Sequence, residues 1–287
     1  MDDFLTYRGR LAPSPTGLLH LGHASTFWTA WQRALQSNGI LAFRNEDLDP
    51  HRSRPEFVHA MMEDLRWLGI EWNEGPDVGG PYVPYAQSQR RELYIAAWQR
   101  LRDGGFIYPC MCSRKDLAQS ASAPHEAEND HNDEPLYSGL CRSRLAEARK
   151  YAVPREVNWR FRVPDGERVR FHDIRQGPQQ YIAGQDFGDF VVWRRDDVPA
   201  YQLAVVVDDA QMRITEVVRG VDLLKSTARQ ILLSRALGLP QPDYFHCDLL
   251  CDEKGQRLAK RHDALSLRHL RESGCSPAET LARLKKI

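Results

Sequence analysis

A run of proline, glycine and histidine at residues 13–23 constrains the fold of this chain more than any other feature. It reads Pro-Ser-Pro-Thr-Gly-Leu-Leu-His-Leu-Gly-His. The residues before it, Arg8 to Ala12, have the pattern of a short strand, and Ala24 to Ser37 have the apolar spacing of a helix that Asn38-Gly39 can end. The run therefore joins a strand to the N-terminus of a helix.

Two histidines and two glycines stand at this helix entrance. The unpaired N–H groups and the macrodipole of a helix N-terminus attract anionic oxygens, and Gly17 and Gly22 allow a ligand to approach the backbone closely. His20 and His23 add imidazole donors. The pattern predicts a site for nucleotide phosphates. The alternative is that these are ordinary histidines at a helix start, since an isolated His-x-x-His pair is a weak signal.

The composition narrows the class of protein. Among the 287 residues, 39 lysines and arginines balance 39 aspartates and glutamates, so no overall basic field indicates nucleic acid, although a local basic face is possible. The N-terminus lacks a basic segment followed by an apolar one, and no stretch reaches membrane-spanning length. We therefore expect a cytoplasmic protein without membrane contact, whose six cysteines are thiols rather than disulfides.

Strand and helix patterns alternate along the chain. A second strand is predicted over Ile40–Arg44, and helices that end at glycines are predicted over Arg54–Leu68 and Ser88–Arg102. This alternation is typical of an α/β fold with a parallel sheet. Further predicted strands are Phe106–Pro109, Trp159–Val163, Arg168–Ile174, Gly188–Arg194 and Ile214–Val218, and further helices are Arg142–Lys150, Ala200–Ala210, one capped by Ser226 or Thr227 that ends at Leu237, and two short ones from Ser266 and Ser276.

A cluster of carboxylates follows the second predicted strand. Glu46, Asp47 and Asp49 lie just after Arg44. Open α/β sheets bind their ligands at the carboxyl ends of the strands, so this cluster is a candidate binding site. The alternative is a solvated acidic turn before Pro50.

Three cysteines and one tyrosine have a spacing that suits a metal. Cys110 and Cys112 follow the strand at Phe106–Pro109, and Tyr137 and Cys141 come about two dozen residues later. Three thiolates and one phenolate can complete a tetrahedral zinc shell. The alternative is a set of unlinked buried cysteines.

The segment between the two halves of this pattern is rich in acids. Residues 119–135 contain almost no large apolar side chain, which predicts a mobile loop. His125 and His131 in that loop are alternatives to Tyr137 as a metal ligand. After the loop, arginines 160, 162, 168 and 170 alternate on predicted strands, where they can face phosphates or simply keep an exposed sheet face charged.

Two segments carry a resemblance to a known family. Residues 10–23, which read Arg-Leu-Ala-Pro-Ser-Pro-Thr-Gly and end in His-Leu-Gly-His, resemble the first signature of class I aminoacyl-tRNA synthetases in the form of the glutamyl and glutaminyl branch. Residues 254–264 resemble the second signature, although Arg257 replaces its first lysine and Ala259 its serine. Lys260 matches the second lysine. Taken without the resemblance, this segment is a basic surface loop.

The resemblance covers nearly the whole chain and implies an architecture. A Rossmann-like parallel-sheet catalytic domain is expected over residues 1–108 and 186–245, with an inserted zinc-bearing α+β module over residues 109–185. Residues 246–287 are expected to hold the second-signature loop and a short C-terminal helical segment. The chain leaves no room for an anticodon-binding domain after Lys260, so none is expected.

The resemblance also implies a reaction and its residues. ATP with Mg²⁺ would activate L-glutamate to glutamyl-adenylate by attack of the α-carboxylate on the α-phosphate, a reaction that needs positioning and electrostatics more than a general base. His20, His23 and Lys260 would be catalytic, and these three with Gly22 would bind ATP. The implied glutamate-binding residues are Arg10, Leu11, Ala12, Pro13, Ser14, Glu46, Tyr201 and Arg219, and the implied ligands of one structural zinc are Cys110, Cys112, Tyr137 and Cys141.

The acceptor is a family inference alone. The subgroup made of the catalytic portion activates glutamate without tRNA and transfers it to the queuosine base in the anticodon of tRNA(Asp), and a monomer is expected. Three alternatives stay open: a discrete glutamyl-tRNA synthetase that charges the tRNA 3′ end, a class I-like nucleotidyltransferase acting on another acid, and a non-catalytic module that binds tRNA or nucleotides.

Overall fold

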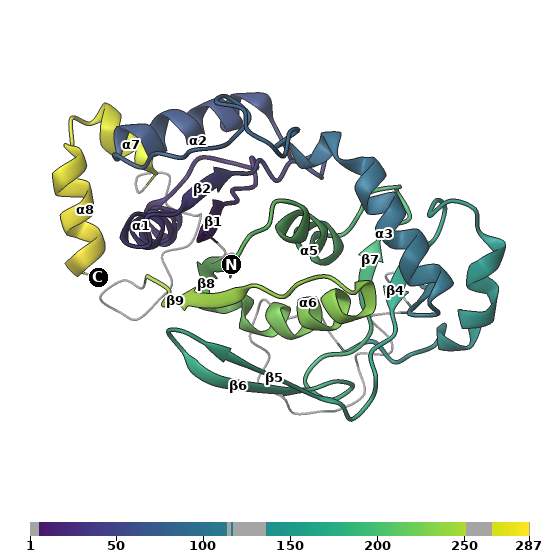
Figure 1. Cartoon of the computed structure of the whole chain (residues 1–287). Helices are drawn as coiled ribbons and strands as arrows, with labels where there is room; N and C mark the ends of the chain where they lie inside the picture. Colours follow the sequence, from purple (N-terminus) through teal and green to yellow (C-terminus); the bar gives the residue numbers. More distant parts are fainter. Residues whose placement is uncertain (1–5, 114–115, 117–135, 251–265, 287) are drawn as a thin grey trace, which may run out of the picture.

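A parallel sheet occupies the centre of the computed structural model, which describes residues 6–113, 116, 136–250 and 266–286 (Figure 1). Strands β1 (Arg8–Leu11) and β2 (Ile40–Phe43) pair in parallel, and helix α1 (Leu21–Gln36) connects them. A second parallel pair follows much later in the chain. It consists of β8 (Glu216–Gly220) and β9 (Asp243–Cys247), which α6 (Leu224–Leu237) connects.

The two pairs lie side by side. The backbone N–H of Thr215, just before β8, donates to Arg8 O in β1 at 2.9 Å, which gives the spatial order β2, β1, β8, β9. The connection after β1 leads outward to β2 on one side of the sheet, and the connection after β8 leads outward to β9 on the other side. The boundary between β1 and β8 is therefore the point where the strand order reverses, and the carboxyl ends of strands at such a point are the usual ligand site of an α/β sheet.

Antiparallel strands surround this sheet. Strands β3 (Ile107–Cys110), β4 (Asn158–Phe161) and β7 (Phe190–Trp193) form an antiparallel sheet of their own. The hairpin of β5 (Arg168–Asp173) and β6 (Gly177–Ile182) runs along the edge of the parallel sheet in Figure 1. It joins that sheet where Asp173 pairs with Tyr244 of β9.

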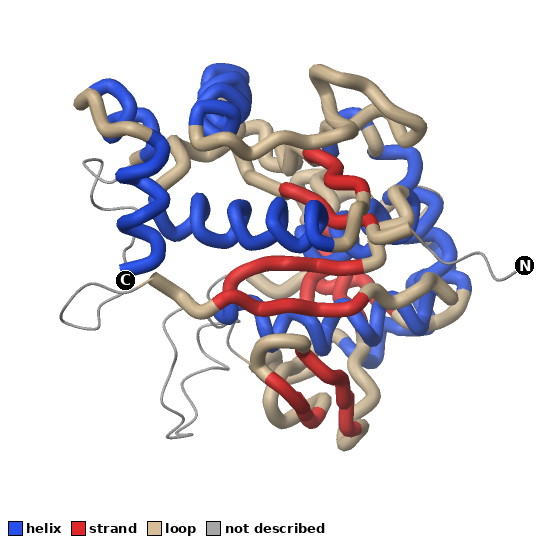
Figure 2. The backbone as a smooth tube through the Cα atoms, turned by 60° about the vertical axis from the view of Figure 1, so that its left-hand side comes forward, coloured by secondary structure: helices blue, strands red, loops and turns tan. Residues whose placement is uncertain are grey.

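The remaining helices cover the sheets. They are α2 (Pro55–Trp67), α3 (Arg91–Asp103), α5 (Tyr201–Gln211), α7 (Leu267–Glu272) and α8 (Pro277–Lys286), with 3₁₀ turns η1 (Gln87–Gln89), η2 (Arg142–Lys150) and η3 (Val221–Leu223). Helices α7 and α8 lie beside α1 and α2 in Figures 1 and 2, and Arg268 of α7 donates to Asp64 of α2 at 2.9 Å. None of the helices within the described ranges is both long and apolar enough to cross a membrane.

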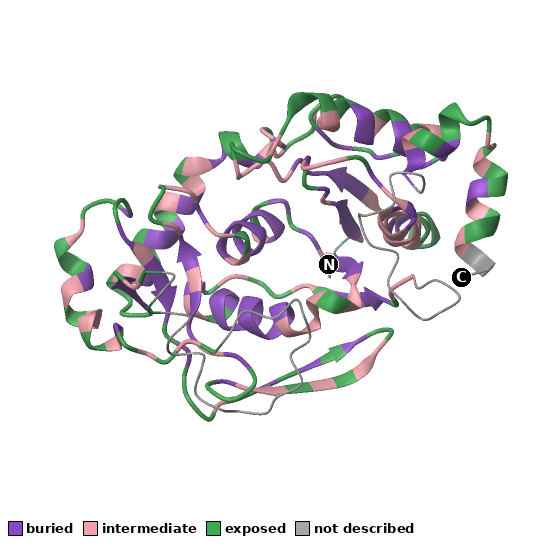
Figure 3. Cartoon of the chain, turned by 180° about the vertical axis from the view of Figure 1, so that it is seen from behind, coloured by how far each residue is buried: buried purple, intermediate pink, exposed green. Residues whose placement is uncertain are grey.

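Two hydrophobic clusters hold these elements together. Figure 3 shows the buried residues concentrated on the central strands and on α5 and α6, while the β5–β6 hairpin is largely exposed or intermediate. One cluster contains the fully buried Trp98, Trp159 and Trp193 and lies between α3, α5, α6 and the antiparallel strands. The other packs α1, α2 and α7 against β1 and β2. Because strands of the same parallel sheet contribute residues to both clusters, the strand ends that form the site are anchored by both.

The α/β fold with a parallel sheet agrees with the sequence prediction, but several local predictions were wrong. Strands β6 and β9 were not predicted. The segment Arg142–Lys150 is a run of 3₁₀ turns because only Ala148 in it is buried, which gives an α-helix no apolar face to pack. Ser226 and Thr227 do not cap α6, which begins at Leu224. Tertiary contacts recruit both hydroxyls instead, that of Ser226 by Gln202 and that of Thr227 by Arg219.

Candidate active site

A cavity of about 210 Å³ opens at the carboxyl ends of the parallel strands. Arg10 lies in β1, Glu46 follows β2, and Arg219 lies near the end of β8. The cavity is lined by these three residues and by Ala12, His20, Gly22, His23 and Tyr201. Segments more than 200 residues apart thus meet at the point where the strand order reverses, as expected for a ligand site in this kind of sheet.

The two histidines at the start of α1 have a defined tautomer. Nδ1 of His20 accepts the backbone N–H of Gly22 at 3.1 Å, and Nδ1 of His23 accepts the backbone N–H of His20 at 3.4 Å. The rings stack with their centroids 3.8 Å apart. Because Nδ1 is an acceptor in both rings, the proton of each neutral imidazole lies on Nε2. Both rings therefore present an N–H donor, and a Cβ at Gly22 would come within 3.0 Å of the His20 ring.

A buried cluster of alternating charges forms the floor of the cavity. Arg44, which is fully buried, donates to Glu46 Oε1 at 3.0 Å and to Asp209 Oδ1 at 2.7 Å. Arg10 Nη1 donates to Val218 O at 2.8 Å, while its Nε lies 3.6 Å from Asp209 Oδ1 and is buried without a hydrogen-bond partner among the described residues. A buried donor left without a partner in a cavity wall is suited to a ligand acceptor.

Burial shifts the pKa values of this cluster. It raises the pKa of the Glu46 carboxyl, although the positive charges of Arg44 and Arg10 act in the opposite direction. It lowers the pKa of the Arg10 guanidinium, which Asp209 partly restores. An ammonium group beside Glu46 would replace the hydration that burial removes and would favour its ionised form.

The guanidinium of Arg219 is held on three sides. Its Nε donates to His246 Nε2 at 3.1 Å, its Nη2 donates to Thr227 Oγ1 at 2.7 Å, and its Nη1 lies 3.4 Å from the hydroxyl of Tyr201. Tyr201 is the first residue of α5, remains 36% exposed and lines the cavity beside Arg219. Arg219 therefore has a fixed orientation before any ligand binds.

Two adjoining cavities enlarge the site. One of about 770 Å³ contains Pro13, Ser14 and the two histidines, and one of about 600 Å³ contains Ser14 and Gln202. Glu46 and Tyr201 line all three cavities. The combined space can hold a nucleotide and a small second ligand side by side.

The comparisons with known proteins agree with this geometry. A family model described as tRNA synthetases class I (E and Q), catalytic domain, matches residues 6–287. The chain belongs to this family. As a member of the synthetase family it is an ATP-dependent ligase with a class I catalytic domain.

The names of its relatives describe enzymes that join glutamate to tRNA. The chain is 50% identical over 278 residues to the "Glutamyl-Q tRNA(Asp) synthetase" of Symbiobacterium thermophilum. This match covers 96% of this chain and 84% of that protein. The chain is 48% identical over 282 residues to the protein of the same name from Nitratidesulfovibrio vulgaris, with 98% and 86% covered. A solved glutamate tRNA ligase from Elizabethkingia meningosepticum, in complex with its amino acid, matches with a TM-score of 0.75 at 29% identity. That match covers 94% of this chain and 53% of the solved chain, so the chain spans about half of that protein.

The structure of the synthetase chain brings together most of the site residues that the sequence singled out. Arg10, Glu46, Tyr201 and Arg219 share one cavity with both histidines. Leu11 does not join them, because its side chain is fully buried in the core around α1 and lines none of the three cavities. Lys260 lies outside the described residues, as do Arg257, Ala259 and the segment 119–135 with its two histidines.

Several residues that shape the site were missed by sequence reasoning. Arg44 and Asp209 build the charged floor, and Asp173 and His246 stand behind Arg219. The apolar run Tyr-Phe-His-Cys at residues 244–247 was the available signal for β9, and a histidine inside such a run is commonly a buried one with hydrogen-bond partners.

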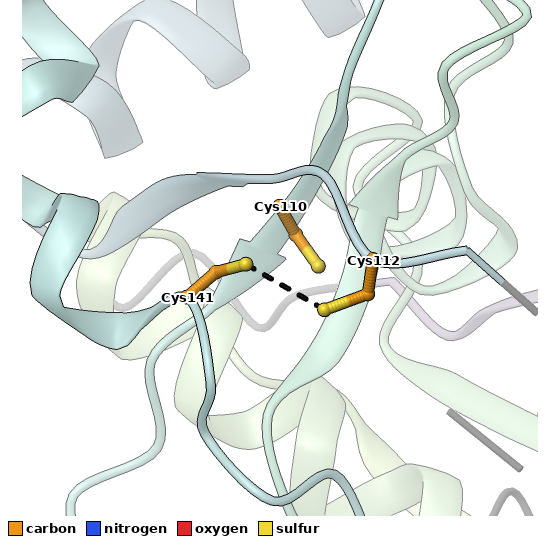
Figure 4. Close-up of side chains that lie close together, drawn as sticks. All are labelled: Cys110, Cys112 and Cys141. Carbon is orange, nitrogen blue, oxygen red and sulfur yellow. Dashed lines mark hydrogen bonds between the residues drawn. The ribbon is translucent and has the colours of Figure 1, made fainter. Parts of the chain in front are cut away.

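The three cysteines that suit a metal converge in the synthetase domain. The side chains of Cys110, Cys112 and Cys141 point toward one another in Figure 4, and their Sγ atoms all lie within 4.8 Å of one another. The Tyr137 hydroxyl lies 3.5 Å from Cys110 Sγ and 3.2 Å from Cys112 Sγ. The four donors predicted from the sequence are therefore neighbours, and three sulfur atoms with one oxygen suit zinc.

A buried network supports this cluster. Burial raises the pKa of the Cys112 thiol to about 11. Arg160 places its guanidinium 4.1 Å from the centroid of the Tyr137 ring and donates to Asp189 O at 2.8 Å. Because Arg160 is only 3% exposed, the expectation that it can face phosphates is wrong. Its charge is used for a cation–π contact that fixes Tyr137, whereas Arg162 and Arg168 are exposed.

Proposed function

We propose that this chain activates L-glutamate with ATP to glutamyl-adenylate, without tRNA, and transfers the glutamyl group to the queuosine base in the anticodon of tRNA(Asp). The proposal is supported by the two relatives named glutamyl-Q tRNA(Asp) synthetase, which are 50% and 48% identical to this chain. The observation that carries it is one cavity with two buried guanidinium groups, Arg10 and Arg219, and one buried carboxylate, Glu46. Glutamate has two carboxylates and one ammonium group, so its charges are complementary to these three buried groups.

Each part of glutamate has a partner in this arrangement. Glu46 would accept the α-ammonium group in a charge-assisted hydrogen bond, and Arg10 and Arg219 would each hold a carboxylate. A guanidinium fork distinguishes a carboxylate from an amide, because the amide nitrogen of glutamine presents donors to donors. Tyr201 closes the wall beside Arg219. Ala12, Pro13 and Ser14 follow Leu11, the last residue of β1, and line the adjoining cavity together with both histidines.

Activation would take place at the entrance of α1. An oxygen of the glutamate α-carboxylate attacks the α-phosphorus of ATP, the new P–O bond forms in line with the bond to the β-phosphate, and pyrophosphate leaves with that bonding pair. The nucleophile is already ionised, so no general base is needed. The Nε2–H groups of His20 and His23 and the N-terminus of α1, with its close backbone at Gly22, would stabilise the phosphate charge. Mg²⁺ would accompany ATP, and Lys260 would supply a further cation.

The cysteine cluster would hold one structural zinc. Cys110 at the end of β3, Cys112 just after it, and Cys141 before η2 supply sulfur ligands, and Tyr137 supplies an oxygen. A bound zinc would stabilise the deprotonated form of Cys112, whose thiol pKa burial raises. It would also link the segment of Cys110 and Cys112 to the segment of Tyr137 and Cys141, about two dozen residues later in the chain.

Replacing Cys112 with serine tests the zinc site. Wild-type protein expressed with zinc should contain about one zinc per chain, whereas Cys112→Ser should lose most of it and unfold at a lower temperature, because a structural zinc contributes directly to folding. Metal content by mass spectrometry and thermal unfolding measure both effects. Cys275→Ser is the matched control, since Cys275 is a free thiol outside the cluster. A zinc content equal to that of wild type in Cys112→Ser would refute the ligand set.

Transfer of labelled glutamate tests the acceptor. The protein should attach [¹⁴C]glutamate to tRNA(Asp) that contains queuosine but not to tRNA(Asp) that lacks it. Removal of the 3′-terminal adenosine should leave the transfer unchanged, because the proposed acceptor lies in the anticodon. Acid-precipitable radioactivity is the measurement. Transfer that requires the 3′ adenosine and ignores queuosine would contradict the proposal and assign the chain to the synthetases that charge the 3′ end.

A further inference from the structure

Two fully buried residues stand behind Arg219 on the side away from the cavity. His246 lies in β9, and its Nδ1 is 2.6 Å from Oδ2 of Asp173 at the end of β5. The side chains of both residues are 0% exposed. Neither residue lines any of the three cavities of the site, so neither can touch a ligand there.

The hydrogen bonds determine the protonation of His246. An ionised carboxylate only accepts, so His246 Nδ1 must carry a proton toward Asp173. The guanidinium of Arg219 only donates, so His246 Nε2, at 3.1 Å from Arg219 Nε, must be the acceptor. The ring is therefore neutral with its proton on Nδ1. Burial and the neighbouring charge of Arg219 lower the pKa of His246 to about 4, in agreement with this assignment.

This acceptor fixes one edge of the guanidinium. The Nε–H of Arg219 and one Nη2–H point along the same edge, and His246 Nε2 and Thr227 Oγ1 occupy it. A third N–H lies toward the Tyr201 hydroxyl. Hydrogen bonds to described residues thus account for three of the five N–H groups, which leaves one on each terminal nitrogen. These two N–H groups, one on each terminal nitrogen, are the donors that can hold a carboxylate in bidentate geometry.

Asp173 has a second set of contacts that holds it in place. Its Oδ1 accepts the backbone N–H groups of Arg175 at 3.0 Å and Gln176 at 2.8 Å in the hairpin turn, and that of His246 at 3.2 Å. Burial alone would raise the pKa of the Asp173 carboxyl, but the hydrogen bonds from His246 and from the backbone lower it. The carboxylate therefore joins the β5–β6 hairpin, β9 and the imidazole at one point.

We propose that Asp173 and His246 form a positioning pair that orients Arg219 for a carboxylate of the substrate. Asp173 sets the tautomer of His246, and His246 presents an acceptor that holds one edge of the guanidinium so that these two N–H groups face the cavity. The inference rests on the proposed glutamate activation and assigns part of its specificity to two residues without substrate contact. The hairpin that carries Asp173 thereby contributes to amino acid recognition from outside the cavity.

Replacing Asp173 with asparagine separates positioning from folding. The amide oxygen can still accept the turn N–H groups, so the amide nitrogen then faces His246 Nδ1 as a donor. His246 must move its proton to Nε2, where it opposes the N–H of Arg219. We expect the KM for glutamate in glutamate-dependent exchange of pyrophosphate into ATP to rise at least about tenfold, with the KM for ATP unchanged within about twofold. Nitrogen-15 NMR of the ring should show the proton moving from Nδ1 to Nε2.

Variants of His246 complete the test. In His246→Gln the amide can donate to Asp173 and accept from Arg219, so the glutamate KM should stay within about threefold of wild type, whereas His246→Leu should match Asp173→Asn or exceed it. His172→Leu is the control, because His172 lies on the same strand with an exposed side chain. If His246→Leu does not fold, the contrast between Asp173→Asn and His246→Gln still decides.

The outcomes distinguish the two proposals. Wild-type protein without any glutamate-dependent exchange would overturn the proposed function and this inference with it. Active wild type with an unchanged glutamate KM in Asp173→Asn would overturn the positioning pair alone. Equal rises in the KM for glutamate and for ATP would also overturn it, because they would indicate a general structural defect.

Discussion

Replacing Glu46 with glutamine is expected to lower kcat/KM for glutamate in the pyrophosphate exchange reaction by about two to three orders of magnitude. Removing the charge of one partner in a buried ion pair typically costs about 3–4 kcal/mol, which converts to that factor. Both hydrogen bonds that Arg44 donates to Glu46 reach Oε1, so Oε2 is the oxygen available to an α-ammonium group. Glutamine keeps the shape of this side chain and removes only the charge. The KM for ATP should remain unchanged.

A second carboxylate provides the matched control for this experiment. Glu216 is 5% exposed and accepts two hydrogen bonds from Arg33, so it is a buried, paired glutamate like Glu46, but it lines none of the cavities of the site. Glu216→Gln should lower the free energy of unfolding without a comparable loss in kcat/KM for glutamate. A loss of less than about threefold in Glu46→Gln would remove Glu46 from ammonium recognition.

The parts of this site that depend on neighbours in sequence were predictable. The strand before residue 13 and the helix after His20 follow from local periodicity. A short helix was also predicted from Ser266, and α7 begins there, with the Ser266 hydroxyl accepting the N–H of His269. The resemblance to one synthetase branch then pointed to Arg10, Glu46, Tyr201 and Arg219, whose side chains share one cavity. Local rules suffice here because a strand–turn–helix unit fixes its own geometry.

The parts that depend on distant neighbours were not predictable. Arg44 and Asp209 are 165 residues apart, and Asp173 and His246 are 73 residues apart, so no spacing rule relates them. The residues of both pairs occupy positions that carry no distinctive signal in the sequence. Arg44 was the last residue of a predicted strand, and Asp208 and Asp209 lay inside the helix predicted over residues 200–210. The strand β9, which places His246, is only five residues long, and its pairing with β5 rests on a single residue pair.

The charged floor of the cavity is expected to be the largest single electrostatic contribution to stability. Replacing Arg44 with methionine should lower the free energy of unfolding by about 3–5 kcal/mol, because it removes the nearest positive charge from the buried carboxylates of Glu46 and Asp209. Arg44 is 0% exposed and lies 3.0 Å from Glu46 Oε1, 2.7 Å from Asp209 Oδ1 and 3.9 Å from Asp208 Oδ2. Burial opposes its charge, but these three carboxylates outweigh burial and raise the pKa of Arg44. Urea denaturation followed by circular dichroism measures the change.

Two further variants show whether the loss comes from charge rather than from packing. Arg235→Met removes an ion pair whose side chains are 52% and 40% exposed, and it should change the free energy of unfolding by less than about 1 kcal/mol. Arg44→Met combined with Asp209→Asn should recover part of the loss, because one of the unpaired carboxylates is then neutral. If the loss came from packing instead, the double variant should be less stable than Arg44→Met, because a second substitution at a packed site adds its own cost. If the double variant is no more stable than Arg44→Met, the floor is held by shape, and the charges that match glutamate must be fixed by the strands alone.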